Sequence, residues 1–120
     1  MARELVVKVT CGTDAPERAN QGFTVAATAA ASGVPVSLWL TGESVWLATP
    51  GRAAELELPL ATPVPDLLAT VLELGSVTVC SQCAARRGIG EGDVLAGVRI
   101  AGAPVFVEEC LRDGVQALVY

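Results

Sequence analysis

The feature that most constrains the fold of this chain is an alternation between short β-branched runs and segments that carry helix signals. Five apolar runs are predicted as strands, at residues 5–10, 34–40, 76–79, 98–101 and 115–120. The segments between them supply residues that start or stop helices. Strands that alternate with helices at this spacing predict an α/β fold, in which a parallel sheet is covered by helices on both faces.

The helices are predicted from their boundary residues. Residues 13–17 (Thr-Asp-Ala-Pro-Glu) form a helix-start signal, and Gly33 ends the alanine-rich helix that follows it. A short helical turn is expected over residues 41–48, and a long, proline-rich irregular loop over residues 49–63. Further helices are expected at residues 66–75, 81–87 and 104–113.

Length and composition fit one domain. The chain has 120 residues, of which 52% are hydrophobic and 18% are charged. This length is enough to bury one core, and no repeat or linker divides it, so residues 1–120 are predicted to form a single domain. The apolar composition predicts strands buried on both faces or an extensive interface between subunits, with Trp39 and Trp46 in the core or at that interface.

Charge and the N-terminal sequence bear on partners and location. A net charge of −5, with Arg86-Arg87 as the one basic cluster, argues against binding to nucleic acid or to an anionic membrane. The uncharged stretch at 19–42 approaches the length of a membrane span, but Asn20, Gln21 and the break at residues 33–35 favour a helix and a strand of a soluble domain. The N-terminus enters the first strand without a signal-peptide pattern, which predicts a cytoplasmic protein.

Residues 77–88 (Val-Thr-Val-Cys-Ser-Gln-Cys-Ala-Ala-Arg-Arg-Gly) hold the strongest candidate for chemistry. Cys80 ends a β-branched run, and a helix-forming segment that contains Cys83 follows at once. A thiol placed where a strand gives way to a helix meets the positive end of the helix dipole and unpaired backbone N–H groups, which favour the thiolate. Because thiolates are the nucleophiles of sulfur chemistry, Cys80 is the candidate nucleophile and Cys83 the candidate resolving or accessory thiol.

The sequence contains no histidine, which removes many enzyme classes. Ser-His and Cys-His catalysis are excluded, as is any metal site with a His ligand. Since the chain shows no export signal, its four cysteines are predicted to be free thiols, at positions Cys11, Cys80, Cys83 and Cys110. No metal and no cofactor is predicted.

Other interpretations of the cysteines stay open. Four thiolates would bind zinc only if Cys11 and Cys110 converged on the pair at positions 80 and 83. A thioredoxin-like redox pair is compatible with the spacing, although the Trp-Cys and cis-Pro context is missing. Free Cys is often buried, so the pair also has a purely structural interpretation, which is the expectation for Cys110 in its apolar helix.

Charged neighbours belong to the same candidate site. Arg86 and Arg87 follow the second thiol by three and four residues, so one of them is able to face the thiols, lower a thiol pKa and hold an anionic substrate. The alternative is a solvated charge that complements the helix dipole. Cys11 and Glu43 follow the first and second strands, so both are expected at the same rim of the sheet as Cys80.

These motifs resemble those of the DsrE/DsrF-like family of small sulfur-relay proteins, which includes the TusD and YchN groups. The similarity covers nearly the whole chain, through residues 5–32, 34–43 and 114–120 and above all residues 79–88. The Cys-x-x-Cys-x-x-x-Arg-Gly form of the last segment is particularly similar to the YchN-like branch.

The resemblance implies a three-layer α/β/α fold with a five-stranded parallel sheet, assembled as trimers or hexamers. It implies that Cys80 accepts a sulfane sulfur as a persulfide and passes it between donor and acceptor proteins. Of the two arginines that follow the thiols, Arg87 is the predicted substrate-binding residue. The predicted function is therefore a cytoplasmic sulfur-relay protein, a sulfurtransferase-like persulfide carrier. Two alternatives stay open: a non-catalytic oligomeric interaction module, and a redox switch between Cys80 and Cys83.

Overall fold

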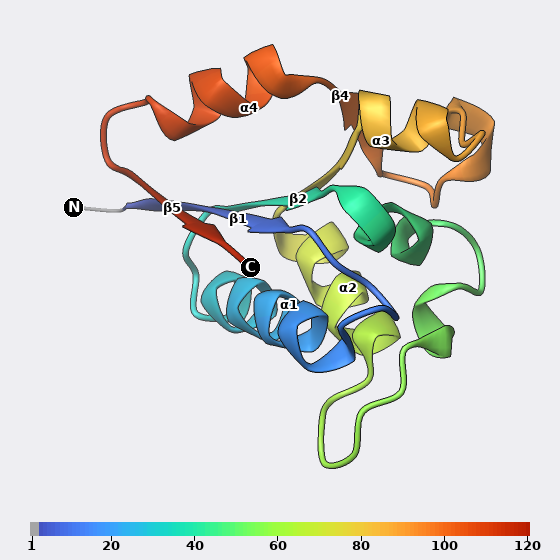
Figure 1. Ribbon diagram of the computed structural model, residues 1–120. Coiled ribbons are helices and arrows are strands. Elements are labelled where there is room, and N and C mark those ends of the chain that lie inside the picture. Colours follow the sequence, from blue (N-terminus) through green and yellow to red (C-terminus); the bar gives the residue numbers. More distant parts are fainter. Residues whose placement is uncertain (1–2) are drawn as a thin grey trace.

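The computed structural model describes residues 3–120, which form a five-stranded parallel sheet with helices on both faces (Figure 1). The strands are β1 (Glu4–Val9), β2 (Val36–Leu40), β3 (Ser76–Cys80), β4 (Arg99–Ala101) and β5 (Val115–Val119). The α-helices are α1 (Pro16–Ala31), α2 (Val64–Leu74), α3 (Ser81–Arg86) and α4 (Ala103–Cys110). The 3₁₀ helices are η1 (Gly42–Ala48), η2 (Ala53–Glu55) and η3 (Glu91–Asp93). The predicted α/β fold with a five-stranded parallel sheet is confirmed.

The strand order β4-β3-β2-β1-β5 explains why the helices lie on two faces. The chain adds β2, β3 and β4 in turn to one side of β1 and then returns to place β5 on the other side. Because β-α-β crossovers are right-handed, a reversal of direction across the sheet moves the connecting helix to the opposite face. Accordingly, α1 and α2 lie below the sheet in Figure 1 and α4 lies above it.

The two faces of the sheet differ in chemistry, because successive residues of a strand point to opposite sides. The side chains that face α1 and α2 belong to the main core, and in the three central strands its buried members are Val7, Val9, Val36, Leu38, Leu40, Val77 and Val79. The side chains of the same strands that lie on the α4 side include Lys8, Ser37, Trp39, Thr78 and Cys80. One face is therefore an apolar core, and the other gathers polar and reactive groups.

The alanine-rich face of α1 is buried. Ala19, Phe23 and Ala26 are fully enclosed, and α1 packs on both the sheet and α2. The uncharged stretch at 19–42 is divided between α1 and β2, as predicted. Among residues 3–120, none of the helices combines the length and the apolar character that crossing a bilayer requires.

The loops that follow β1 and β2 meet backbone against backbone at the carboxyl ends of the strands. Gly42 has a φ of +56°, and a Cβ there would lie 2.4 Å from the carbonyl oxygen of Thr10. A Cβ at Gly12 would lie 2.8 Å from the carbonyl oxygen of Glu43. These glycines permit the close approach that defines the rim of the sheet where Cys80 also lies.

Some element boundaries differ from the predicted ones. β2 begins at Val36 because Pro35 has no N–H to donate to the ladder. α2 begins at Val64, earlier than predicted, because Pro65 falls in the first turn, where a missing N–H costs nothing. The predicted irregular loop at 49–63 contains η2, and α4 ends at Cys110, before the predicted end.

Candidate functional site

Cys80 lies at the junction between β3 and α3, where it was predicted. It is the last residue of β3 and the N-cap of α3, with an extended backbone at φ −64° and ψ 124°. Its half-buried thiol lies at the start of α3, where the backbone N–H groups of Gln82 and Cys83 and the thiol of Cys83 act on its pKa. The junction therefore brings both thiols of the motif together.

The surroundings of Cys80 favour its thiolate. Burial by itself raises the pKa of the Cys80 thiol, because a charge is less stable away from water. The hydrogen bonds from Cys83 and Gln82, together with the charge of Lys8, outweigh burial and lower that pKa below its ordinary value. A lower pKa raises the thiolate fraction at neutral pH and so the reactivity of Cys80 toward electrophilic sulfur.

A small pocket opens beside the Cys80 thiol. Its volume is about 50 Å³, and its other walls are formed by Lys8, Trp39, Thr41, Ala103 and Phe106. The rings of Trp39 and Phe106 meet edge to face, with centroids 5.2 Å apart and planes at 75°. Lys8 Nζ lies 4.8 Å from the centroid of the Phe106 ring. The thiol therefore faces an enclosure of aromatic carbon that contains one cation.

A buried carboxylate fastens α4 to the sheet beside this pocket. Glu109 Oε1 accepts hydrogen bonds from Ser37 Oγ at 2.6 Å and from Trp39 Nε1 at 3.1 Å. Glu109 Oε2 pairs with Arg99, which also donates to Thr78 Oγ1. Burial by itself raises the pKa of Glu109, but these hydrogen bonds and the charge of Arg99 lower it overall. The ionised Glu109 thus holds Trp39 and α4 in position.

The two arginines of the motif have different partners. Arg87 Nε pairs with Glu43 Oε2 at 2.8 Å, and Arg87 Nη1 donates to the Cys83 carbonyl oxygen at 3.0 Å. Arg86 Nη1 lies 4.0 Å from Cys83 Sγ. Glu43 is at the rim of the thiol site, as predicted, and its pair with Arg87 ties α3 to η1. Substrate binding by Arg87 stays a prediction, and Arg86 is the arginine that faces a thiol.

The other two cysteines lie apart from the pair. Cys11 follows β1, as predicted, but it is buried in the core on the α1 side, where burial and Asp14 raise the pKa of its thiol more than Arg18 lowers it. Cys110 ends α4, where burial and the charge of Glu109 raise the pKa of its thiol. Within residues 3–120, no three Cys, Asp or Glu side chains gather in an arrangement suited to a metal ion. The convergence of four thiols that a zinc site would need is therefore not found in that part of the chain.

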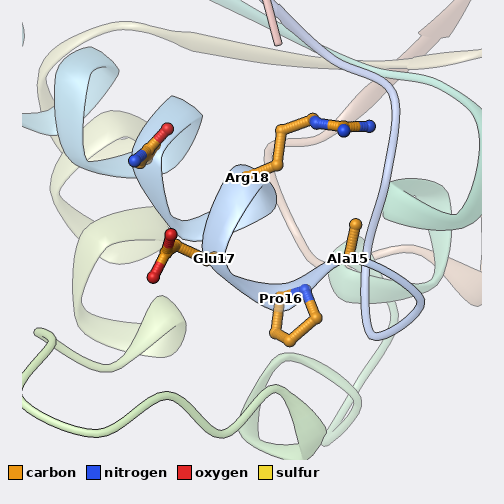
Figure 2. Close-up of a pocket in the computed structure, with 5 residues that line it drawn as sticks. Ala15, Pro16, Glu17 and Arg18 are labelled. Atoms are coloured by element: carbon orange, nitrogen blue, oxygen red, sulfur yellow. The ribbon is translucent and has the colours of Figure 1, made fainter.

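A wider concavity lies at the start of α1. It measures about 410 Å³ and is lined by Ala15, Pro16, Glu17, Arg18 and Gln21. The side chains of Glu17 and Arg18 point away from each other (Figure 2). Sites for small molecules bring a few polar groups together around the ligand, which these residues do not do. The smaller pocket beside Cys80 is the stronger candidate.

Comparison with known proteins agrees with this geometry. The sequence pattern of the DsrE/DsrF-like family matches residues 4–118. The chain belongs to this family. DsrE/DsrF-like proteins are associated with sulfur relay, and the resemblance predicted from residues 79–88 is confirmed.

Two relatives of this DsrE/DsrF-like chain come from Methanocaldococcus jannaschii, and both are described as uncharacterized proteins. MJ0760 is 30% identical over 114 residues, which cover 94% of this chain but 42% of MJ0760. MJ0989 is 33% identical over 94 residues, which cover 74% of this chain and 78% of MJ0989. This chain therefore spans less than half the length of the first relative.

Solved structures establish the fold independently. YchN from E. coli aligns with a TM-score of 0.81 at 16% identity, covering 98% of this chain and 99% of YchN. MTH1491 from Methanobacterium thermoautotrophicum, a protein of unknown function, has a TM-score of 0.73 at 11% identity, covering 98% of this chain and 99% of MTH1491. BT1422 from Bacteroides thetaiotaomicron, also of unknown function, has a TM-score of 0.64 at 17% identity, covering 98% and 95%. At these identities the likeness shows the fold alone.

The sequence predicted the two thiols of the site but not the walls of the pocket. Lys8 had no predicted role, and Trp39, predicted in the core or at an interface, is buried but also lines the pocket. A signal was present, because Lys8 is a charged residue within an otherwise apolar run. The role of Lys8 follows only from the register of the sheet, in which Lys8 pairs with Trp39 and Trp39 pairs with Thr78.

Proposed function

We propose that this protein is a sulfur-relay carrier that holds sulfane sulfur as a persulfide on Cys80. The observation that carries the proposal is the place of Cys80, at the start of α3 and in the wall of a pocket that also contains Lys8. Membership of the DsrE/DsrF-like family supports the same chemistry. The relay would operate in the cytoplasm, between a donor protein and an acceptor protein.

The transfer is an exchange among sulfur atoms. The Cys80 thiolate attacks the outer sulfur of a donor persulfide, forms a new S–S bond and releases the donor thiolate. An acceptor thiolate then attacks the outer sulfur carried by Cys80, and Cys80 leaves as a thiolate. A lowered pKa supports both steps, because Cys80 is a nucleophile in the first and a leaving group in the second.

Mass spectrometry after incubation with glutathione persulfide tests the proposal. We expect the mass of one sulfur atom to be added at Cys80 of the wild type, and no addition at that position in Cys80→Ser. Cys110→Ser is the matched control, because the pKa of the Cys110 thiol is raised and its removal should leave loading unchanged. A wild type that gains no sulfur at Cys80, and so behaves like Cys80→Ser, would contradict the proposal.

A redox switch is the second candidate, and the contact between the two thiols of the motif favours it. The Cys83 thiol neighbours that of Cys80 at the start of α3, so an external disulfide oxidant would link them by thiol–disulfide exchange. In a relay, Cys83 has another role, since its attack on the inner sulfur of the Cys80 persulfide forms the same disulfide and releases hydrosulfide. Cys83→Ser separates the candidates: it leaves sulfur loading of Cys80 intact but abolishes the disulfide on which a switch depends.

Self-association is also part of the proposal, as the trimer or hexamer that the family resemblance implies. Val107 on α4, Leu111 directly after it and Val119 on β5 are exposed apolar side chains. Val119 pairs with Lys8 across the strands, so it lies on the α4 side of the sheet. These side chains support an interface on that face. A non-catalytic interaction module would use the same face but would not need the lowered pKa of the Cys80 thiol.

A further inference from the structure

Among residues 3–120 Lys8 has no carboxylate partner, and it lines the Cys80 pocket. It is the only lysine of the sequence, and it lies half-buried on β1. It takes part in none of the ion pairs formed among residues 3–120. A partly buried ammonium group without a counter-charge is unfavourable, and its contact with the Phe106 ring compensates only in part. The pocket therefore favours the arrival of an anion.

The sheet register explains how this cation comes to act on the thiol. Lys8 on β1 pairs with Trp39 on β2, and Trp39 pairs with Thr78 on β3. Cys80 lies two residues beyond Thr78 and so on the same face of the sheet. The Trp39 side chain stands between the strands that carry Lys8 and Cys80, and all three side chains line one pocket.

Helix α4 covers the pocket and limits its size. Ala103 and Phe106 of α4 supply the cover, and Phe106 contacts Trp39. Just before α4, a Cβ on Gly102 would lie 3.2 Å from Ser81 Oγ, so the starts of α3 and α4 are packed closely together. The pocket volume of about 50 Å³ is larger than one water molecule requires, but it admits only a group of a few atoms. Aromatic walls also strengthen charge interactions inside, because they exclude water.

We propose that this pocket is the holding site of the transferred sulfur, in which the ammonium group of Lys8 is the counter-charge of the terminal sulfur of a Cys80 persulfide. The ligand is one sulfane sulfur in its anionic form, and its size and charge match the small, cationic pocket. The inference rests on the proposed persulfide chemistry of Cys80 and adds the residue that holds the product. Lys8 is a positioning residue, which binds the charge and exchanges no proton with it.

The loading step balances without an oxidant or reductant. The Cys80 thiolate attacks the outer sulfur of a donor R–S–SH, the donor S–S bond breaks, and the donor leaves as R–S⁻. The resulting Cys80–S–SH releases its proton to water, because a persulfide is a stronger acid than its parent thiol. The product, Cys80–S–S⁻, then pairs with the ammonium group of Lys8. One sulfur–sulfur bond has replaced another, so the exchange involves no net oxidation or reduction.

Substitution of Lys8 tests the inference. Lys8→Met keeps the length of the aliphatic stem and removes the charge, whereas Lys8→Arg keeps the charge. The titratable groups that face Cys80 are Lys8 and Cys83, since α4 faces it with Ala103 and Phe106. The nearby charges of Glu109 and Arg99 neutralise each other. A change in the pH profile of Cys80 on removal of Lys8 is therefore attributable to that charge.

The measurements are persulfide occupancy of Cys80 after treatment with glutathione persulfide, and the pH profile of Cys80 alkylation by iodoacetamide. We expect Lys8→Met to lower occupancy at neutral pH by roughly threefold to tenfold, as for the loss of one partly screened charge. The alkylation midpoint should move to higher pH by about half a unit to one unit. Lys8→Arg should restore both. Arg18→Met, which removes an exposed cation beside Cys11, is the matched control and should change neither.

Each outcome bears on a different statement. If the wild type takes up no sulfur at Cys80, the proposed relay function fails. If the wild type loads sulfur and Lys8→Met loads it equally, with the same pH profile, the relay stands and the role of Lys8 is overturned. A loss in Lys8→Met that alkaline pH does not recover indicates a packing defect, which also overturns the assigned charge role.

Discussion

At the scale of single residues, the fold gives chemically identical thiols different acidities. The N–H groups of Gln82 and Cys83 and the Cys83 thiol lower the pKa of Cys80, although burial opposes this. At Cys11 burial outweighs the effect of the Arg18 side chain, and at Cys110 burial and the charge of Glu109 act together, so the pKa of each of these thiols is raised. Reactivity is therefore a property of the β3–α3 junction, and it does not follow from cysteine content.

Alkylation rates should reproduce this order. At a pH below all of the thiol pKa values, the thiolate fraction falls about tenfold for each unit by which the pKa is higher. We expect iodoacetamide to label Cys80 first as the pH is raised, at least about tenfold faster than Cys110 or Cys11 at neutral pH. Peptide mass spectrometry after timed quenching measures the rates, and unfolded protein is the control in which the order should disappear. Equal, slow labelling of the three native thiols would favour the interaction module.

The residue that carries the reactive thiol was predictable, because its cause is local. A β-branched run that ends in Cys80 and passes directly into a helix specifies the junction within a few residues. Lys8 was not predictable in this way. Its role requires Trp39 beside it and Phe106 above it, and those neighbours come from β2 and α4.

At the scale of secondary-structure elements, α4 depends on one buried carboxylate. Glu109 is buried, whereas its neighbour Glu108 on the same helix is exposed. Glu109 accepts hydrogen bonds from Ser37 and Trp39 of β2 and pairs with Arg99 of β4. This carboxylate links two strands to the helix that covers the pocket.

Glu109→Gln should therefore destabilise the protein. The amide oxygen can still accept hydrogen bonds, but Arg99 loses its counter-charge, and we expect a cost of about 1.5 kcal/mol at neutral pH because Arg99 is half exposed. Since the pKa of Glu109 is lower in the folded state, its contribution is complete above the pKa of an unfolded glutamate and is lost as the pH falls through the folded pKa.

Urea unfolding at neutral and acidic pH measures this effect. The difference in the free energy of unfolding between wild type and Glu109→Gln should shrink as the pH is lowered. Glu108→Gln is the matched control, because its exposed side chain should contribute little at either pH. A difference that is independent of pH would mean that Glu109 acts through packing and not through its charge.

The order of the elements was predicted because its signals are local. The helix-start pattern at residues 13–17 and Gly33 bracket α1, and the β-branched runs mark the strands. The start of α2 was predicted too late, at residue 66, because the fit of Pro65 to the first helical turn was not recognised. The polar cluster under α4 was missed, because Glu109 and Ser37 are distant in sequence and meet only in the folded sheet.

At the scale of the whole molecule, the two faces of the sheet are covered unequally. The face toward α1 and α2 is enclosed by a continuous apolar core. The opposite face carries α4, and exposed apolar side chains remain there on α4 and β5. The predicted burial of strands on both faces would be completed by an interface between subunits.

Charge substitutions on this face should therefore change the oligomeric state. Val107 on α4 is 51% exposed, and Leu111, directly after α4, is 77% exposed. We expect Val107→Glu combined with Leu111→Glu to convert a trimer or hexamer to monomers, because burial of two carboxylates in an apolar interface is unfavourable. Leu74→Glu is the matched control, since Leu74 is 53% exposed at the end of α2 on the other side of the sheet. Size-exclusion chromatography with light scattering measures the mass of each variant. Dissociation by Leu74→Glu alone would place the interface on the α2 side, and a monomeric wild type would contradict self-association.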